Sequence, residues 1–345
     1  MSEDAEPRRR RPRYRGTNPR HFEHKYKEAD PCSYPETLAK VLASGKTPAG
    51  SHLPIMVSEI LEVLRPSPGE LAVDCTLGFG GHSLKILPCL LPGGRLLGLD
   101  ADPIELPRAE KRLRQCGFTE DTFSAFRCNF AGVAAVLARA AGRAADIILA
   151  DLGVSSMQID NPARGFSLKH DGPLDMRMNP NKGIPASEAL HRLGEEDLES
   201  ILRENADEPA AKQLASALAG ARLKSTSELA QAVRARLGAQ PAAERELSVR
   251  RVFQALRIHV NDELQVLDTL LKLLPAQLAP GGRAAILTLH SGEDRRVKKA
   301  FETGLIQGVY SQISSTVIRA GAEEQRANPR SKSAKLRWAL RGPDA

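Results

Sequence analysis

The chain has few aromatic residues and no long apolar run. Phe, Trp and Tyr make up 4% of its 345 residues, so aliphatic side chains must fill the core, and 41% of the residues are apolar. No run of 18 apolar residues occurs, so no membrane-spanning helix is expected. The polar, acidic start, Met1 to Asp4, lacks the apolar region of a signal peptide, and early acids argue against a transit peptide. We therefore expect a cytoplasmic protein without a membrane partner.

Cysteines are few and do not form a recognisable pattern. Their number is odd and no C-x-x-C spacing occurs. A disulfide framework and a structural zinc site are therefore not expected, no metal is predicted, and a reducing cytosol fits. The cysteines are Cys32, Cys75, Cys89, Cys116 and Cys128.

Charge permits a polyanionic partner without demanding one. The formal net charge is +7 and the pI is about 9.2, which suits RNA binding and equally suits a basic soluble protein. Residues 1–50 contain the basic run Arg8 to Arg15, which cannot bury itself. We expect a disordered N-terminal extension, acting either as an RNA-contacting arm or as a solvated tail.

Five apolar segments alternate with helical segments from about residue 52 onward. Helices are expected at 83–91 and 104–116, and alternating strands and helices indicate a doubly wound, Rossmann-like parallel sheet. The predicted strands are 71–74, 95–100, 123–128, 146–151 and 283–289.

The interval between the fourth and fifth strands, about 130 residues, is too long for one crossover. It carries helical patterns, so we predict a sheet domain formed by 51–164 and 251–345 with a helical subdomain, 165–250, inserted into it. Apolar residues from Val260 to Leu274 repeat at four-three spacing, which predicts a single helix leading back to the fifth strand.

Polar residues gather where the predicted strands end. In a doubly wound sheet, ligands bind at the carboxyl ends of the strands. A candidate ligand site therefore combines four successive strand ends. It comprises Asp74, Gly78 to His82, Asp100, Asn129-Phe130 and Asp151.

The glycine cluster suggests a nucleoside ligand. Gly80 and Gly81 let backbone approach a ligand closely, although the spacing is neither G-x-G-x-x-G nor a P-loop. Asp100 can accept the hydroxyls of an adenosine ribose. A tight turn and a solvent-facing strand end are the alternative interpretations. The acids Asp74, Asp100 and Asp151 suit a cationic ligand such as S-adenosylmethionine better than a pyrophosphate.

Several further segments are too distinctive to be explained by packing. They include D-L-G-V-S-S-M-Q-I-D (151–160), R-G-F-S (164–167), D-G-P-L-D-M-R-M (171–178), F-Q-A-L-R-I (253–258) with Asn261, H-S-G-E-D-R (290–295), N-P-R-S (328–331), H-x-P-I (52–55) and G-G-H-S (80–83). In this order they resemble the ribosomal RNA small subunit methyltransferase H family, also called MraW, over about residues 52–341.

The resemblance implies N4-methylation of a cytidine at the decoding centre, numbered 1402 in 16S rRNA of the small ribosomal subunit. It also implies S-adenosylmethionine as donor and suggests a homodimer. The family's donor-binding positions correspond to Gly80, Gly81, His82, Asp100, Phe130, Asp151 and Gln158.

This chain departs from the family pattern in four places. About 50 residues precede the usual start, Gly292 replaces the Leu of H-S-L-E-D, 206–209 replaces Y-G-E-E, and the segment between Arg295 and Asn328 is short. A protein or small-molecule acceptor, and a non-catalytic RNA-binding assembly factor, are the competing hypotheses. The intact donor-site residues argue against a decayed site.

The chemistry predicts a proton acceptor after the fourth strand. The exocyclic amine of cytosine is a weak nucleophile, so positioning and an acceptor for its proton should help. Asp151 is the best candidate catalytic residue, with Ser155 or Ser156 as alternatives. Asp151 could instead contact only the donor.

A row of polar residues predicts RNA contacts. Arg250, Gln254, Arg257 and Asn261 fall on one helix face at four-three-four spacing, as RNA ligands or as a solvated face. Arg330 could add a phosphate contact. Two further residues are ambiguous: Phe166 suits a stacked base or the core, and His290 suits the substrate or a structural role.

Overall fold

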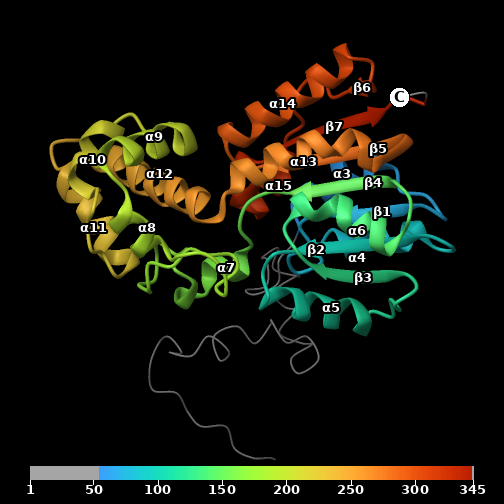
Figure 1. Ribbon diagram of the computed structural model, residues 1–345, viewed down its shortest axis with the longest axis horizontal. Coiled ribbons are helices and arrows are strands. Elements are labelled where there is room, and N and C mark those ends of the chain that lie inside the picture. Colours follow the sequence, from blue (N-terminus) through green and yellow to red (C-terminus); the bar gives the residue numbers. More distant parts are fainter. Residues whose placement is uncertain (1–53, 344–345) are drawn as a thin grey trace, which may run out of the picture. The chain divides into compact units, whose positions relative to one another are not determined.

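The computed structural model describes residues 54–343, which contain a seven-stranded sheet with helices on both faces (Figure 1). The strand order is β3-β2-β1-β4-β5-β7-β6. The predicted N-terminal extension, 1–50, lies outside the described residues. No helix within 54–343 is both long and apolar enough to cross a membrane.

The five predicted strands are confirmed and pair in parallel. They are β1 (Leu71–Asp74), β2 (Arg95–Asp100), β3 (Phe123–Arg127), β4 (Ala145–Asp151) and β5 (Leu278–Thr288). In register, Asp74 lies opposite Gly98 and Asp151 lies opposite Leu287. The reversal of strand order beside β1 is the topological switch point at which doubly wound sheets bind ligands. The predicted fold class, a Rossmann-like α/β sheet, is therefore confirmed.

Two strands were not predicted. β7 (Lys335–Arg341) pairs antiparallel with both β5 and β6 (Tyr310–Ile313). After β5 the chain forms a helix and then the edge strand β6, and it returns as β7 between β5 and β6. The sheet is mixed rather than purely parallel.

Helices pack on both faces of the sheet because alternate strand residues point to opposite sides. Leu71 and Val73 face one core with α6 (Val133–Ala140), α13 (Glu263–Gln277) and α14 (Ser291–Ile306). Ala72 faces the other with α3 (Val57–Leu64), α4 (Ser83–Leu90) and α5 (Glu105–Gln115). Both cores are largely aliphatic, as the low aromatic content predicts.

The chain between β4 and β5 is largely helical and has an apolar core of its own, which includes Leu202, Leu214 and Val252. Apart from α13, which packs on the sheet, these helices gather at one end of it in Figure 1. The predicted bounds of 165 and 250 stay a prediction, and residue 250 falls inside α12. The elements are α7 (Ser156–Asp160), η3 (Pro162–Arg164), α8 (Ala186–Arg192), α9 (Glu195–Ala206), α10 (Ala211–Leu218), α11 (Thr226–Arg236) and α12 (Ala242–Asn261).

The prediction of one helix through 260–274 is wrong. α12 ends at Asn261, and α13 begins at Glu263. Asp262 between them has φ 52°, a left-handed conformation that ends a helix. The four-three apolar repeat therefore continues across a bend, which separates α12 beside the other inserted helices from α13 on the sheet.

Candidate active site

Three carboxylates lie at the carboxyl ends of neighbouring parallel strands. Asp74 ends β1, and its side chain accepts hydrogen bonds from Ser83 Oγ (2.7 Å) and from the Thr76 N–H (3.1 Å). Asp100 ends β2 and accepts the N–H of Gly78 at 2.7 Å. Asp151 ends β4. The predicted convergence of these acids on one edge of the sheet follows from the strand order.

The pKa values of these carboxylates are raised because burial disfavours their charged forms. Burial raises the pKa of Asp100 to about 6 and that of Asp151 to about 6, and repulsion from Asp74 adds to both shifts. Burial likewise raises the pKa of Asp74, against the hydrogen bond from Ser83. A site that brings several buried acids together is suited to a cationic ligand.

The loop between β1 and α4 requires its glycines. Gly78 and Gly80 have φ of +50° and +76°, in the left-handed region that glycine adopts without a Cβ penalty. A Cβ on Gly81 would lie 3.1 Å from Pro54. The loop backbone therefore packs closely against Pro54 at Gly81, and the Gly78 N–H donates to Asp100.

The side chain of His82 links the glycine loop to Asp151. Its Nε2 lies 3.0 Å from the carbonyl oxygen of Ile55, which can only accept, so Nε2 carries a hydrogen. The other nitrogen, Nδ1, lies 3.7 Å from Asp151 Oδ2, beyond hydrogen-bond distance but close enough for charge interaction. The attraction of His82 opposes the burial-driven rise in the pKa of Asp151.

Gln158 is held in a defined orientation. Its Oε1 accepts the Ser155 N–H at 2.9 Å while Ser155 Oγ accepts the Gln158 N–H, which forms a capping box on α7. Its Nε2 donates to Asp102 Oδ2 at 2.8 Å. Phe130 lies in η2 (Phe130–Gly132), partly buried against the core. All the predicted donor-binding residues therefore lie at the carboxyl ends of β1 to β4 or in the segments that follow them.

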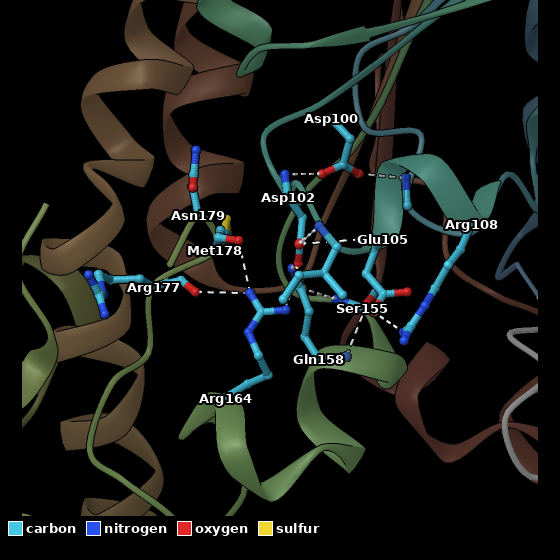
Figure 2. A network of polar contacts seen from close by, with 12 residues as sticks. Asp100, Asp102, Glu105, Arg108, Ser155, Gln158, Arg164, Arg177, Met178 and Asn179 are labelled. Atoms are coloured by element: carbon cyan, nitrogen blue, oxygen red, sulfur yellow. Dashed lines mark hydrogen bonds and ion pairs between the residues drawn. The ribbon is translucent and has the colours of Figure 1, made fainter. Parts of the chain in front are cut away.

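Asp102 is a site residue that sequence reasoning missed. It is 1% exposed, lies two residues after Asp100, and receives both Gln158 and Arg164 (Figure 2). The sequence pattern that could have identified it is an Asp just before a predicted helix, because Asp is a preferred N-terminal cap.

Three of the four residues in the predicted RNA-binding row have partners within the chain. Gln254 Nε2 donates to the Asn205 carbonyl at 2.8 Å. Arg257 forms two 2.8 Å hydrogen bonds with Glu263, and Asn261 Oδ1 accepts the Met178 N–H. Their role in RNA binding stays a prediction. To bind these side chains, RNA would have to replace their contacts within the chain.

The fourth member of the row and the C-terminal arginine are more accessible. Arg250 is exposed on α12. The side chain of Arg330 keeps 45% of its surface exposed, with Nη2 3.7 Å from Asp160 Oδ1. Both guanidinium groups are therefore available to a polyanion.

The D-G-P-L-D-M-R-M segment contacts the inserted helices. The Leu174 N–H donates to the Lys224 carbonyl, and Asp171 Oδ1 accepts the N–H of Ser227 in α11. Phe166 is 9% exposed within the apolar core of the insert. This placement favours the structural interpretation of Phe166 over base stacking.

His290 immediately precedes α14, and the carboxylate of Glu293 lies beside its ring. Glu293 Oε1 lies 3.2 Å from His290 Nε2, while Oε2 accepts the Leu289 N–H. Burial would raise the pKa of Glu293, yet His290 and Arg257 lower it overall. His290 thus lies beside a buried acid, while its two buried ring nitrogens have no hydrogen-bond partner among the described residues.

Two departures from the family pattern lie near each other. Asp207, within 206–209, accepts hydrogen bonds from Ser291 Oγ (2.6 Å) and Arg295 Nη2 (3.0 Å). A Cβ on Gly292 would lie 3.2 Å from His290 Nδ1 and 3.9 Å from the Glu204 carbonyl. The altered residues therefore meet where α9 contacts α14.

Comparison with known proteins gives full-length matches. The model of the MraW methylase family matches residues 49–341. Ribosomal RNA small subunit methyltransferase H 1 of Lachnoclostridium phytofermentans is 46% identical over 99% of this chain and 95% of that protein. Ribosomal RNA small subunit methyltransferase H 2 of Acholeplasma laidlawii is 47% identical over 96% of this chain and 98% of that protein.

These alignments bear on the first departure from the family pattern. Because the first relative aligns with 99% of this chain, the N-terminal extension is not peculiar to this chain.

Among solved structures, an rRNA methylase from Streptococcus thermophilus is 10% identical, with a TM-score of 0.39, over 83% of this chain and 93% of that one. That likeness is too low to add to the argument.

Proposed function

The chain belongs to the MraW methylase family, and from this we propose that it transfers a methyl group from S-adenosylmethionine to a base of small-subunit ribosomal RNA. The observation that carries the proposal is full-length similarity to rRNA small subunit methyltransferases combined with buried acids around a glycine loop. A site of this charge fits a donor that carries a sulfonium cation.

The residues present fit this donor. Gly80, Gly81 and His82 would hold it from the glycine loop, and Asp100 would accept its ribose hydroxyls. Asp100 accepts two backbone N–H groups already, at 2.7 and 2.8 Å, and a carboxylate has about four acceptor sites. Bound S-adenosylmethionine supplies the electrophilic methyl group. Phe130 and Gln158 are further proposed donor contacts, and Asp151 is either a donor contact or the proton acceptor.

We propose cytidine N4, at the position numbered 1402 in 16S rRNA, as the acceptor. The amine would attack the methyl carbon as the sulfur–methyl bond of the donor breaks, which releases S-adenosylhomocysteine, and the methylated amine would lose one N–H proton. Asp151 would hold that proton, because its carboxylate ends β4 and has a pKa of about 6. His82 Nδ1 lies 3.7 Å from this carboxylate, and its attraction lowers the pKa of Asp151. Ser155 and Ser156 are the alternative acceptors on the same loop.

The first test is mass mapping of small-subunit rRNA from cells with and without the protein. N4-methylation of the cytidine should disappear without the protein and return with the wild-type chain. Unchanged N4-methylcytidine in its absence would reject the proposed acceptor.

The second test separates the two roles of Asp151. In Asp151→Asn we expect methyl transfer to be lost while the dissociation constant of S-adenosylhomocysteine, measured by calorimetry, stays near the wild-type value. A matched loss of binding would mean that Asp151 contacts only the donor. Asp100→Asn is the comparison variant, which should lose binding.

The RNA-contacting surface is a further part of the proposal. Arg250 and Arg330 would contact phosphates, with Gln254, Arg257 and Asn261 reaching RNA only if it displaces their present partners. Such an enzyme would work in the cytoplasm on small-subunit rRNA. A homodimer is also proposed from the resemblance, and light scattering of the full chain tests it.

A further inference from the structure

A buried ion pair joins the donor side of the site to the segment 162–178 (Figure 2). Arg164 Nη1 lies 2.8 Å from Asp102 Oδ2, and the two side chains are 7% and 1% exposed. A buried pair of this kind contributes little net stability, because desolvation offsets the attraction, yet losing one partner is costly. What the pair provides is a fixed geometry between the segments that carry it.

Asp102 is saturated with donors. Its Oδ1 accepts two backbone N–H groups at the start of α5, at 2.8 and 3.3 Å. Its Oδ2 accepts Gln158 Nε2 and Arg164 Nη1, both at 2.8 Å. Its own N–H donates to Asp100 Oδ1 at 2.8 Å. Any change in the position of Asp100 therefore reaches Arg164 through a single residue.

Arg164 extends the connection toward the inserted helices. Its Nη2 donates to the carbonyls of Arg177 (3.0 Å) and Met178 (2.8 Å). The Met178 N–H in turn donates to Asn261 Oδ1 at 2.7 Å, and Asn261 Nδ2 donates to the Met176 carbonyl at 2.8 Å. Asn261 lies in the last turn of α12, so an unbroken chain of polar contacts runs from β2 to the insert.

The segment 162–178 depends on such contacts for its position. Of its residues, only Pro162–Arg164 form a regular element, a 3₁₀ turn. Met176 has φ +62°, which is uncommon for a residue with a side chain. A Cβ on Gly172 would lie 1.9 Å from the Pro162 carbonyl oxygen. The segment is thus tightly folded on itself but lacks a helix or sheet ladder to fix it.

We propose that Asp102 and Arg164 are positioning residues that couple the donor site to the segment 162–178. Fixing Asp100 by ligand hydroxyls fixes the Asp102 N–H, and with it the carboxylate that holds Arg164. The segment that follows Asp151 is thereby ordered for the acceptor when the donor is in place. This inference rests on the donor part of the proposed function and not on the identity of the acceptor base.

Hydrogen–deuterium exchange of the full chain tests the coupling, with S-adenosylhomocysteine as the probe. The reporters are the amides of Met176 and Met178, which donate to the Arg164 carbonyl and to Asn261. We expect the probe to slow their exchange at least about fivefold in the wild type, the lower end of usual coupling between sites. In Arg164→Met the slowing should vanish.

Arg177→Met is the matched control. It removes an arginine from the same segment, paired with Asp175 at 2.7 Å, without touching Asp102. The control should keep the probe-dependent slowing. If it loses the slowing as Arg164→Met does, the effect belongs to general loosening of the segment and the proposal is overturned.

The unpaired Asp102 in Arg164→Met could prevent folding, so a second variant is needed. Asp102→Asn combined with Arg164→Met removes both charges and should fold, bind the probe and still lack the slowing. Equal slowing in the wild type and this folded double variant overturns the coupling. Absence of probe binding to the wild type in calorimetry instead overturns the donor assignment, so the two failures are distinguishable.

Discussion

Replacing His82 by Gln should move the acid limit of methyl transfer upward in pH. Gln can still donate to the Ile55 carbonyl, as His82 Nε2 does at 3.0 Å, but it cannot become charged. If Asp151 must be ionised to accept the amine proton, the rate in the wild type rises through a pH of about 6, the pKa of that carboxyl. His82 lowers this pKa, so its loss raises it.

The size of the shift follows from the distance between the two groups. At 3.7 Å and an effective dielectric constant of about 20, two unit charges interact by about 4 kcal/mol, equivalent to about 3 pKa units. The side chain of Asp151 keeps 24% of its surface exposed, so solvent screens this interaction, and we expect about one unit. The ionised fraction of Asp151 at pH 7 would then fall from about 90% to about half.

The assay is single-turnover methyl transfer to small-subunit RNA lacking the modification, from pH 5 to pH 9, with donor saturating. Saturation matters because a change in donor affinity then leaves the rate unaffected. An acid limit at the same pH in both proteins would refute the reasoning. A limit that appears only in the donor dissociation constant would assign Asp151 to donor contact.

Three further outcomes are expected. Asp100→Asn should remove a pH dependence of stability: the folded pKa of about 6 exceeds the unfolded value of 3.8, so ionisation opposes folding and stability falls as pH rises between these values. By denaturant titration without donor, the loss of stability from pH 3.5 to pH 7 should be smaller by about 3 kcal/mol in the variant, and equal losses would contradict this. Gly172→Ala should cost at least about 2 kcal/mol of unfolding free energy, since its Cβ meets the Pro162 carbonyl at 1.9 Å; wild-type stability would show that the segment relaxes freely. Arg330→Gln should weaken RNA binding and reduce its logarithmic salt slope by about one, and an unchanged slope would exclude a phosphate contact.

The parallel part of the fold could be predicted because its strands are largely apolar runs, three of which end on acids. Leu71 to Asp74 and Arg95 to Asp100 are examples, and the parallel order then brings Asp74, Asp100 and Asp151 together. β7 carried a readable signal, since Leu336, Trp338 and Leu340 alternate with other residues. It escaped prediction because it breaks the strand–helix alternation on which the rest depended.

The polar row on α12 shows what periodicity leaves open. Spacing places Gln254, Arg257 and Asn261 on one face, and they do lie there. It does not say what faces them, because Asn205 and Glu263 come from a different helix and from beyond a bend. Gln158 was more predictable, since Ser155-x-x-Gln158 is a capping box visible in the sequence.

The insertion of helices between β4 and β5 has a consequence for how the chain folds. These neighbouring strands pair only after the chain that leaves the end of β4 at Asp151 returns to the start of β5 at Leu278. Closing a flexible loop of about 126 residues costs about 2 kcal/mol more than closing one of 12. If the insert, with its own core, folds first, it shortens the effective loop. Truncating a buried insert residue such as Leu214 should therefore slow assembly of a sheet that the residue never touches.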